Sequence, residues 1–133
     1  MSATDLAYLD TSALAKFVIV EAETNALRSF LQSYPLRASS TISQVELLRV
    51  ARRRGFDETV SARALLAGIL LLDIDDAVLT IAAELDPPIL RSLDAIHLAT
   101  ALSLGSQVSV VVTYDVRMQE AARAAGLNVA APA

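Results

Sequence analysis

The sequence predicts an α/β protein with three layers, in which helices cover both faces of a central parallel sheet of about five strands. Short apolar runs alternate along the chain with longer stretches of helical periodicity, the order typical of parallel sheets. The apolar runs are hydrophobic almost throughout, as expected of parallel strands buried on both faces. No linker, repeat or low-complexity segment divides the chain, so we expect one domain over residues 1–133.

Five apolar runs are the candidate strands. The first, Leu-Ala-Tyr-Leu, is closed by Asp10, and a later valine-rich run is followed by Asp115. In chain order the predicted strands are 6–9, 36–39, 70–73, 108–112 and 127–129. Open α/β sheets bind ligands beyond the carboxyl ends of their strands, so polar residues that follow these runs are candidates for a site.

Seven stretches between the strands have helical patterns. Gly55, Gly105 and Gly126 each follow one of them, at the position where a left-handed residue commonly ends a helix. Pro87-Pro88 breaks the chain after the fifth helical stretch. In chain order the predicted helices are 12–18, 23–33, 41–54, 57–69, 75–85, 92–104 and 115–125.

Composition excludes several classes of protein. Hydrophobic residues make up 54% of the chain, too many for a disordered protein. No uninterrupted apolar stretch reaches the roughly 18–20 residues that a membrane span needs, and the N-terminus lacks the positive segment of a signal peptide. The absence of cysteine excludes disulfides, thiolate nucleophiles and zinc–thiolate sites. We therefore expect a soluble, cytoplasmic protein.

The net charge of −4 arises from 15 acids and 11 bases. A mildly acidic protein looks unsuited to nucleic acid, because phosphate neutralisation needs lysine and arginine. The distribution of charge matters more than the sum, however. Ten of the bases are arginine, and four of them cluster at the end of one predicted helix: Arg49, Arg52, Arg53 and Arg54.

Four carboxylates lie where a globular core has little use for a charge: Asp10, Glu46, Asp94 and Asp115. Two of them close apolar runs, and two lie among aliphatic residues of predicted helices. Their separations along the chain are too long for local pairing, so only tertiary structure can bring them together. Converging carboxylates repel one another unless a cation lies among them, and all-oxygen ligands select a hard cation such as Mg²⁺ or Mn²⁺.

Each of these acids also has an explanation that requires no function. Asp10 and Asp115 are favoured N-cap residues for the helices that follow them, and the two explanations are evenly balanced. Glu46 can pair with an arginine of its own helix. Asp94 lies in a first turn, where the helix dipole favours an acid by about 0.3–1 kcal/mol. For Glu46 and Asp94, which lie on apolar helix faces, the pattern favours a functional site.

Other polar residues are weaker candidates. His97 is the only histidine and lies among aliphatic residues, which is more typical of a structural than of a catalytic role. Asp73, Asp75 and Asp76 are typical of strand ends and helix starts. The sequence contains no glycine-rich phosphate loop and no Ser–His–Asp set.

Four segments together resemble the PIN domain, and more narrowly the VapC toxins of toxin–antitoxin pairs. The resemblance spans essentially the whole chain, and four segments in register are specific although each alone is weak. They are Leu9-Asp10-Thr11-Ser12-Ala13-Leu14, Val45-Glu46-Leu47-Leu48-Arg49, Leu93-Asp94-Ala95-Ile96-His97-Leu98-Ala99-Thr100-Ala101 and Thr113-Tyr114-Asp115.

The resemblance implies a PIN-like α/β/α fold and a ribonuclease that depends on Mg²⁺ or Mn²⁺ and cleaves structured RNA such as tRNA or rRNA. It also implies a homodimer and a VapB-type antitoxin, whose C-terminal segment plugs the acidic groove and whose N-terminal part binds operator DNA. The implied catalytic and metal-binding acids are Asp10, Glu46, Asp94 and Asp115, with supporting hydroxyls at Ser12 and Thr113.

The arginines are the candidates for binding RNA. Arg49 and Arg91 are expected to hold phosphates, and Arg52, Arg53 and Arg54 would extend that track. The equally good alternative for Arg49 is a simple ion pair with Glu46. Two other functions compete with the ribonuclease: a non-catalytic module that binds RNA or a peptide, and a phosphatase or DNA nuclease with the same metal chemistry.

Overall fold

The structure, a computed structural model, describes residues 5–133. Its strands form one parallel sheet in the order β3-β2-β1-β4-β5, so β1 lies in the middle. This arrangement confirms the predicted fold class. The strands are β1 (Leu6–Leu9), β2 (Leu36–Ser40), β3 (Leu70–Leu72), β4 (Val108–Val112) and β5 (Val129–Ala130).

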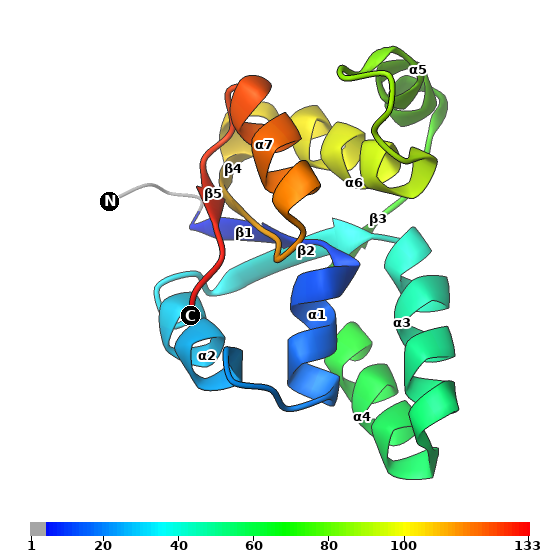
Figure 1. Ribbon diagram of the computed structural model, residues 1–133, viewed down its shortest axis with the longest axis vertical. Helices are drawn as coiled ribbons and strands as arrows, with labels where there is room; N and C mark the ends of the chain where they lie inside the picture. The colour runs from blue at the N-terminus through cyan, green and yellow to red at the C-terminus, as the bar shows by residue number, and fades with distance from the viewer. Residues whose placement is uncertain (1–4) are drawn as a thin grey trace.

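The helices cover both faces of this sheet, as Figure 1 shows: α1 to α4 lie on one side, and α5 to α7 on the other. On the first side are α1 (Thr11–Val18), α2 (Thr24–Leu31), α3 (Ile42–Arg54) and α4 (Phe56–Ala67). On the second side are α5 (Asp76–Glu84), α6 (Ser92–Ser103) and α7 (Val116–Ala124), and the short 3₁₀ helix Gly105–Gln107 precedes β4. No helix within residues 5–133 is both long enough and apolar enough to cross a bilayer.

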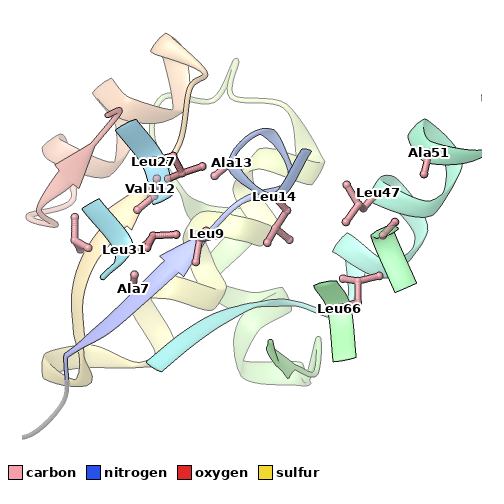
Figure 2. Packing of buried hydrophobic residues seen from close by; sticks show 12 residues of the cluster. Ala7, Leu9, Ala13, Leu14, Leu27, Leu31, Leu47, Ala51, Leu66 and Val112 are labelled. Atoms are coloured by element: carbon pink, nitrogen blue, oxygen red, sulfur yellow. The ribbon is translucent and has the colours of Figure 1, made fainter. Parts of the chain in front are cut away.

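The side chains of the central strand alternate between two hydrophobic cores, because successive residues of a strand point to opposite faces. Ala7 and Leu9 pack toward α1 to α4, whereas Leu6 and Tyr8 pack toward α6. Figure 2 shows Leu9 on β1 close to Leu27 and Leu31, in the first and larger core. The sheet is therefore covered by helices on both faces (Figure 1).

The predicted boundaries agree with the structure to within two residues, and the last strand shares only Val129 with its prediction. It was expected at 127–129 but is Val129–Ala130. Gly126 has φ of 89° and the Leu127 amide bonds back to the carbonyl of Ala122, so the chain is still leaving α7 at that point. Leu127 owes its apolar character to packing against the helices rather than to a place in the sheet.

The strand order creates a topological switch point beside β1. The chain leaves β1 into α1 on one face and leaves β4 into α7 on the other, so the two connections diverge. Such a switch point is where open α/β sheets bind their ligands. The polar residues that follow β1 and β4 therefore lie at the position expected of a functional site.

Candidate active site

The four predicted acids approach the carboxyl edge of the sheet from four different elements. Asp10 directly follows β1, and Asp115 precedes α7 shortly after β4. Glu46 lies in α3, and Asp94 lies in the first turn of α6. Burial raises the pKa of Asp94, and so do the nearby carboxylates of Asp115, Asp10 and Glu46. The tertiary structure thus places the other three acids within electrostatic reach of Asp94.

Asp10 is the most buried of these acids, with 4% of its surface exposed. Its Oδ1 accepts hydrogen bonds from the Ser12 hydroxyl at 2.6 Å and the Ala13 amide at 3.1 Å. The Thr113 hydroxyl donates to Oδ2 at 2.5 Å. Burial raises the pKa of Asp10, although the bonds from Ser12 and Thr113 act in the opposite direction. Ser12 and Thr113, the predicted supporting hydroxyls, therefore orient the central carboxylate.

The capping and functional explanations of Asp10 and Asp115 are compatible. Asp10 caps α1 through the Ala13 amide, and Asp115 caps α7 by accepting from the Arg117 and Met118 amides at 2.9 and 3.2 Å. Both bonds to Asp115 end on Oδ1, which leaves its Oδ2 without a hydrogen bond from residues 5–133. Capping fixes the position of the carboxylate but uses only some of its lone pairs, so the remaining ones can still accept hydrogen bonds or bind a cation.

Glu46 is held by two partners from distant parts of the chain. The Thr11 hydroxyl donates to Oε1 at 2.7 Å, and Nε2 of His97 lies 2.9 Å from the same oxygen. Burial raises the pKa of Glu46, but the bonds from His97 and Thr11 outweigh it, and the net pKa lies below the ordinary value. Within the described residues Arg49 forms no ion pair with Glu46, so the alternative explanation of Arg49 is wrong.

Sequence reasoning missed Thr11 and undervalued His97. His97 is 2% exposed and contacts Glu46 directly, whereas its apolar neighbours in sequence favoured a purely structural role. Tyr8 lies behind it, with its hydroxyl 2.7 Å from Nδ1 of the ring. One local signal existed: Asp94 and His97 are three residues apart and therefore lie on one face of α6.

Asp94 is the acid without a partner. It is half-buried, and it accepts no hydrogen bond and forms no ion pair with residues 5–133. A partly desolvated carboxylate beside three others is unfavourable without a cation. This is the arrangement expected of a group that binds an ion or a proton from outside the protein.

The donor set fits a hard divalent cation. All four side chains offer carboxylate oxygen, the ligand that Mg²⁺ and Mn²⁺ prefer. Within residues 5–133, no three acidic, histidine or cysteine side chains are already closed around a point that would hold a metal ion. Mg²⁺ usually keeps several waters and takes one or two protein carboxylates, so an open arrangement suits it.

The predicted RNA-binding arginines line two separate depressions. Arg49, Arg52 and Arg53, here called the α3 arginine cluster, line a shallow depression of about 300 Å³. Arg91 lies with Asp94 in a second depression of about 370 Å³, which also includes Arg117, a residue that the sequence did not single out. These arginine side chains are exposed, and those of Arg91 and Arg117 line the same depression as Asp94.

Replacing Asp94 with Asn is expected to stabilise the metal-free protein at neutral pH by on the order of 1 kcal/mol, the scale of other surface-charge improvements. The pKa of Asp94 is higher in the folded than in the unfolded state. At pH values between these two pKa values, the folded state therefore binds more protons than the unfolded state. The free energy of unfolding therefore falls as the pH rises through that range. Asp94→Asn has no carboxyl group at this position and does not lose this stability. Thermal melts in EDTA from pH 4 to 7 measure the difference.

The control for this prediction is Asp57→Asn, which removes the same charge from the first turn of another helix, α4. Its melting temperature should stay unchanged or fall, since an acid there is favoured by the helix dipole. If Asp94→Asn melts no higher than the parent protein at pH 7, the acids do not repel one another as described.

Comparison with known proteins agrees with this geometry. The sequence model of the PIN domain family matches residues 7–124. Ribonuclease VapC46 of Mycobacterium tuberculosis (strain ATCC 25618 / H37Rv) is 42% identical over 125 residues, which cover 94% of this chain and 96% of the relative. Ribonuclease VapC47 of Mycobacterium tuberculosis (strain CDC 1551 / Oshkosh) is 42% identical over 130 residues, with the same two coverages.

Solved structures share the fold at lower identity. A toxin–antitoxin complex from Klebsiella pneumoniae contains a chain with a TM-score of 0.73 and 22% identity, covering 96% of this chain and 98% of that chain. VapC20 of Mycobacterium tuberculosis, described as a toxin that cleaves the sarcin–ricin loop, gives a TM-score of 0.72 at 19% identity, with 91% and 95% covered. Because the PIN model spans most of the chain and relatives at 42% identity cover nearly all of it, this protein belongs to the PIN-domain family and, within it, to the VapC proteins.

Proposed function

We propose that this protein is a divalent-metal-dependent endoribonuclease and the toxin of a toxin–antitoxin pair, and that it hydrolyses phosphodiester bonds in structured RNA such as tRNA or rRNA. The observation that carries the proposal is the convergence of four carboxylates, with Asp94 half-buried and unpartnered among them. Membership of the VapC proteins supports it, since the relatives at 42% identity are named ribonucleases.

The proposed ligands of the divalent ion include Asp10, Asp94 and Asp115. Asp10 is immobilised by Ser12, Thr113 and the Ala13 amide, and would be the central ligand of Mg²⁺ or Mn²⁺. When bound, such an ion supplies Lewis acidity to water and to the phosphate oxygens. Oδ2 of Asp115 and the carboxylate of Asp94 accept no hydrogen bond from the described residues, and either can complete the ligand set.

Hydrolysis also needs a group that accepts the proton of the attacking water while the bond from phosphorus to the leaving oxygen breaks. Asp94 is suited to this role, because both of its oxygens are available and its surroundings are partly desolvated. Asp10 is less suited, since its two oxygens already accept three hydrogen bonds.

The arginines provide the RNA-binding surface of this proposal. Arg49, Arg52 and Arg53 extend from Glu46 along α3, and Arg91 approaches Asp94 from the start of α6. A guanidinium group pairs with phosphate through two parallel hydrogen bonds, which holds an RNA backbone on either side of the acids. Structured RNA would be selected by the shape of this surface rather than by base sequence.

A VapB-type antitoxin is the proposed protein partner, and operator DNA would be bound only through it. Structural neighbours support this: one is a toxin–antitoxin complex from Klebsiella pneumoniae, and another is VapBC2 from Rickettsia felis bound to a DNA fragment from the promoter of its genes. The latter has a TM-score of 0.70 at 14% identity, with 94% of this chain and 97% of that chain covered. We also propose that the protein is a homodimer and acts in the cytoplasm.

Cleavage of total tRNA and rRNA by the purified, antitoxin-free protein tests the function. Discrete cuts are expected with Mg²⁺ or Mn²⁺, and none with EDTA or with Asp94→Asn. Mapping the fragment ends identifies the substrate in the same experiment. A folded parent protein that neither cuts RNA nor binds a divalent ion would favour the non-catalytic RNA- or peptide-binding module, and cuts that persist in EDTA would exclude metal dependence.

A further inference from the structure

We propose that His97 is a positioning residue of the metal centre: Tyr8 fixes one nitrogen of its ring, and the other nitrogen fixes Oε1 of Glu46, so that Oε2 is presented to the ion. The inference rests on the proposed function, because it assigns a role toward the divalent ion. It adds to that function the residues that orient Glu46, one of its four acids.

The two contacts of the ring define its tautomer. Nε2 lies 2.9 Å from Oε1 of Glu46, and because a carboxylate only accepts, Nε2 carries the hydrogen and donates it. In the neutral ring Nδ1 is then an acceptor, and it accepts from the Tyr8 hydroxyl at 2.7 Å. Tyr8 thereby stabilises the tautomer that presents a donor to the carboxylate.

Thr11 contacts the same oxygen of Glu46 as His97 does. Its hydroxyl donates at 2.7 Å to the same Oε1 and also lies 3.2 Å from Nε2 of His97. Two donors therefore converge on one oxygen of Glu46, while no residue of 5–133 donates to Oε2. A glutamate side chain is otherwise flexible, and fixing it beforehand removes an entropy cost from ion binding.

The position of His97 links two of the acids. It lies one turn after Asp94 on α6 and bonds to Glu46 on α3, while Tyr8 anchors its ring from β1. A displacement of α6 would therefore move Asp94 and release Glu46 together. A histidine that served only the core would satisfy its nitrogens among core groups, whereas Nε2 here reaches a carboxylate that is 23% exposed.

Mn²⁺ affinity, measured by calorimetry on the purified protein at one pH, tests the inference. His97→Leu removes both contacts, and His97→Asn keeps a group near Nδ1 for Tyr8 but loses the donor to Glu46. Both should weaken Mn²⁺ binding by about 10–100-fold, as loss of an outer-shell partner typically does. His97→Gln places an amide donor near the position of Nε2 and should restore most of the affinity.

A double-mutant cycle separates positioning from a general structural effect. In a Glu46→Gln background, His97→Leu should cause no further loss of Mn²⁺ affinity, because the carboxylate that it orients is gone. Melting curves show that each variant compared is folded.

Parent-like affinity in folded His97→Leu and His97→Asn, or losses that simply add to that of Glu46→Gln, would overturn the positioning role alone. A parent protein that binds no Mn²⁺ would overturn the metal centre and this inference together. A parent that binds Mn²⁺ with the expected His97 dependence but cuts no RNA would contradict only the proposed ribonuclease.

Discussion

Replacing Asp10 with Asn is expected to lower the rate of RNA cleavage by at least about 100-fold and to leave the protein folded. Asp10 is the most buried acid of the site and is held by hydrogen bonds to both of its oxygens, so no other carboxylate can take up its position. Asn retains the size of the side chain and caps a helix as well as Asp does, so α1 should still begin at Thr11. Single-turnover cleavage at saturating Mn²⁺ measures the effect.

Asp75→Asn is a matched control for the capping part of this change. Asp75 caps α5 by accepting the amide of Val78 at 2.9 Å, as Asp10 caps α1 by accepting the amide of Ala13 at 3.1 Å. It lies outside the group of four acids. Its replacement should leave cleavage unchanged, and equal losses from both variants would mean that capping, rather than the charge of Asp10, sustains the activity.

The second large effect is expected from Arg49 and Arg53, which lie four residues apart on one face of α3. Changing both to Gln should weaken RNA binding roughly tenfold or more at low salt and should affect different RNA sequences equally. Log affinity falls with log salt concentration, and each lost phosphate contact reduces the magnitude of this slope by about 0.7–0.9. The slope of the double variant should therefore be smaller in magnitude by roughly 1.4–1.8. Filter binding with catalytically inactive Asp94→Asn as the parent provides the measurement.

Arg28 and Arg123, on α2 and α7, provide a control with the same change in net charge. Their double replacement by Gln should leave the salt slope nearly unchanged. If the control pair loses as much slope as Arg49 and Arg53 do, RNA is attracted by the overall charge of the protein rather than by the α3 arginine cluster.

The agreement between sequence and structure is greatest where the signal is local. The strand 6–9 and the helix after it could be predicted because Leu6–Leu9 is uniformly apolar and Asp10 is a strong N-cap. Gly126 marked the end of α7 correctly, since it takes positive φ there. The strand after it was misplaced because Leu127 is apolar for a tertiary reason, its packing against α6 and α7.

In the candidate site, too, the local features could be predicted from the sequence and the long-range contacts could not. The acids could be found in the sequence because a charge at a strand end or on an apolar helix face is costly without a purpose. The partners of Glu46 could not be found in the same way. Arg49, three residues from Glu46, was a plausible partner, yet Glu46 binds Thr11 and His97, which are 35 and 51 residues away.

The sequence by itself determined the order of strands and helices along the chain, the positions where helices begin and end to within two residues, and the choice of four carboxylates as candidates for the site. These depend on periodicity and capping, which involve residues within a few positions of one another. Only the tertiary structure decided that Ser12 and Thr113 converge on Asp10, and that His97 carries a contact from Tyr8 to Glu46. Such bonds form only after the sheet order β3-β2-β1-β4-β5 has brought distant segments together, because buried polar groups must find partners within the folded core.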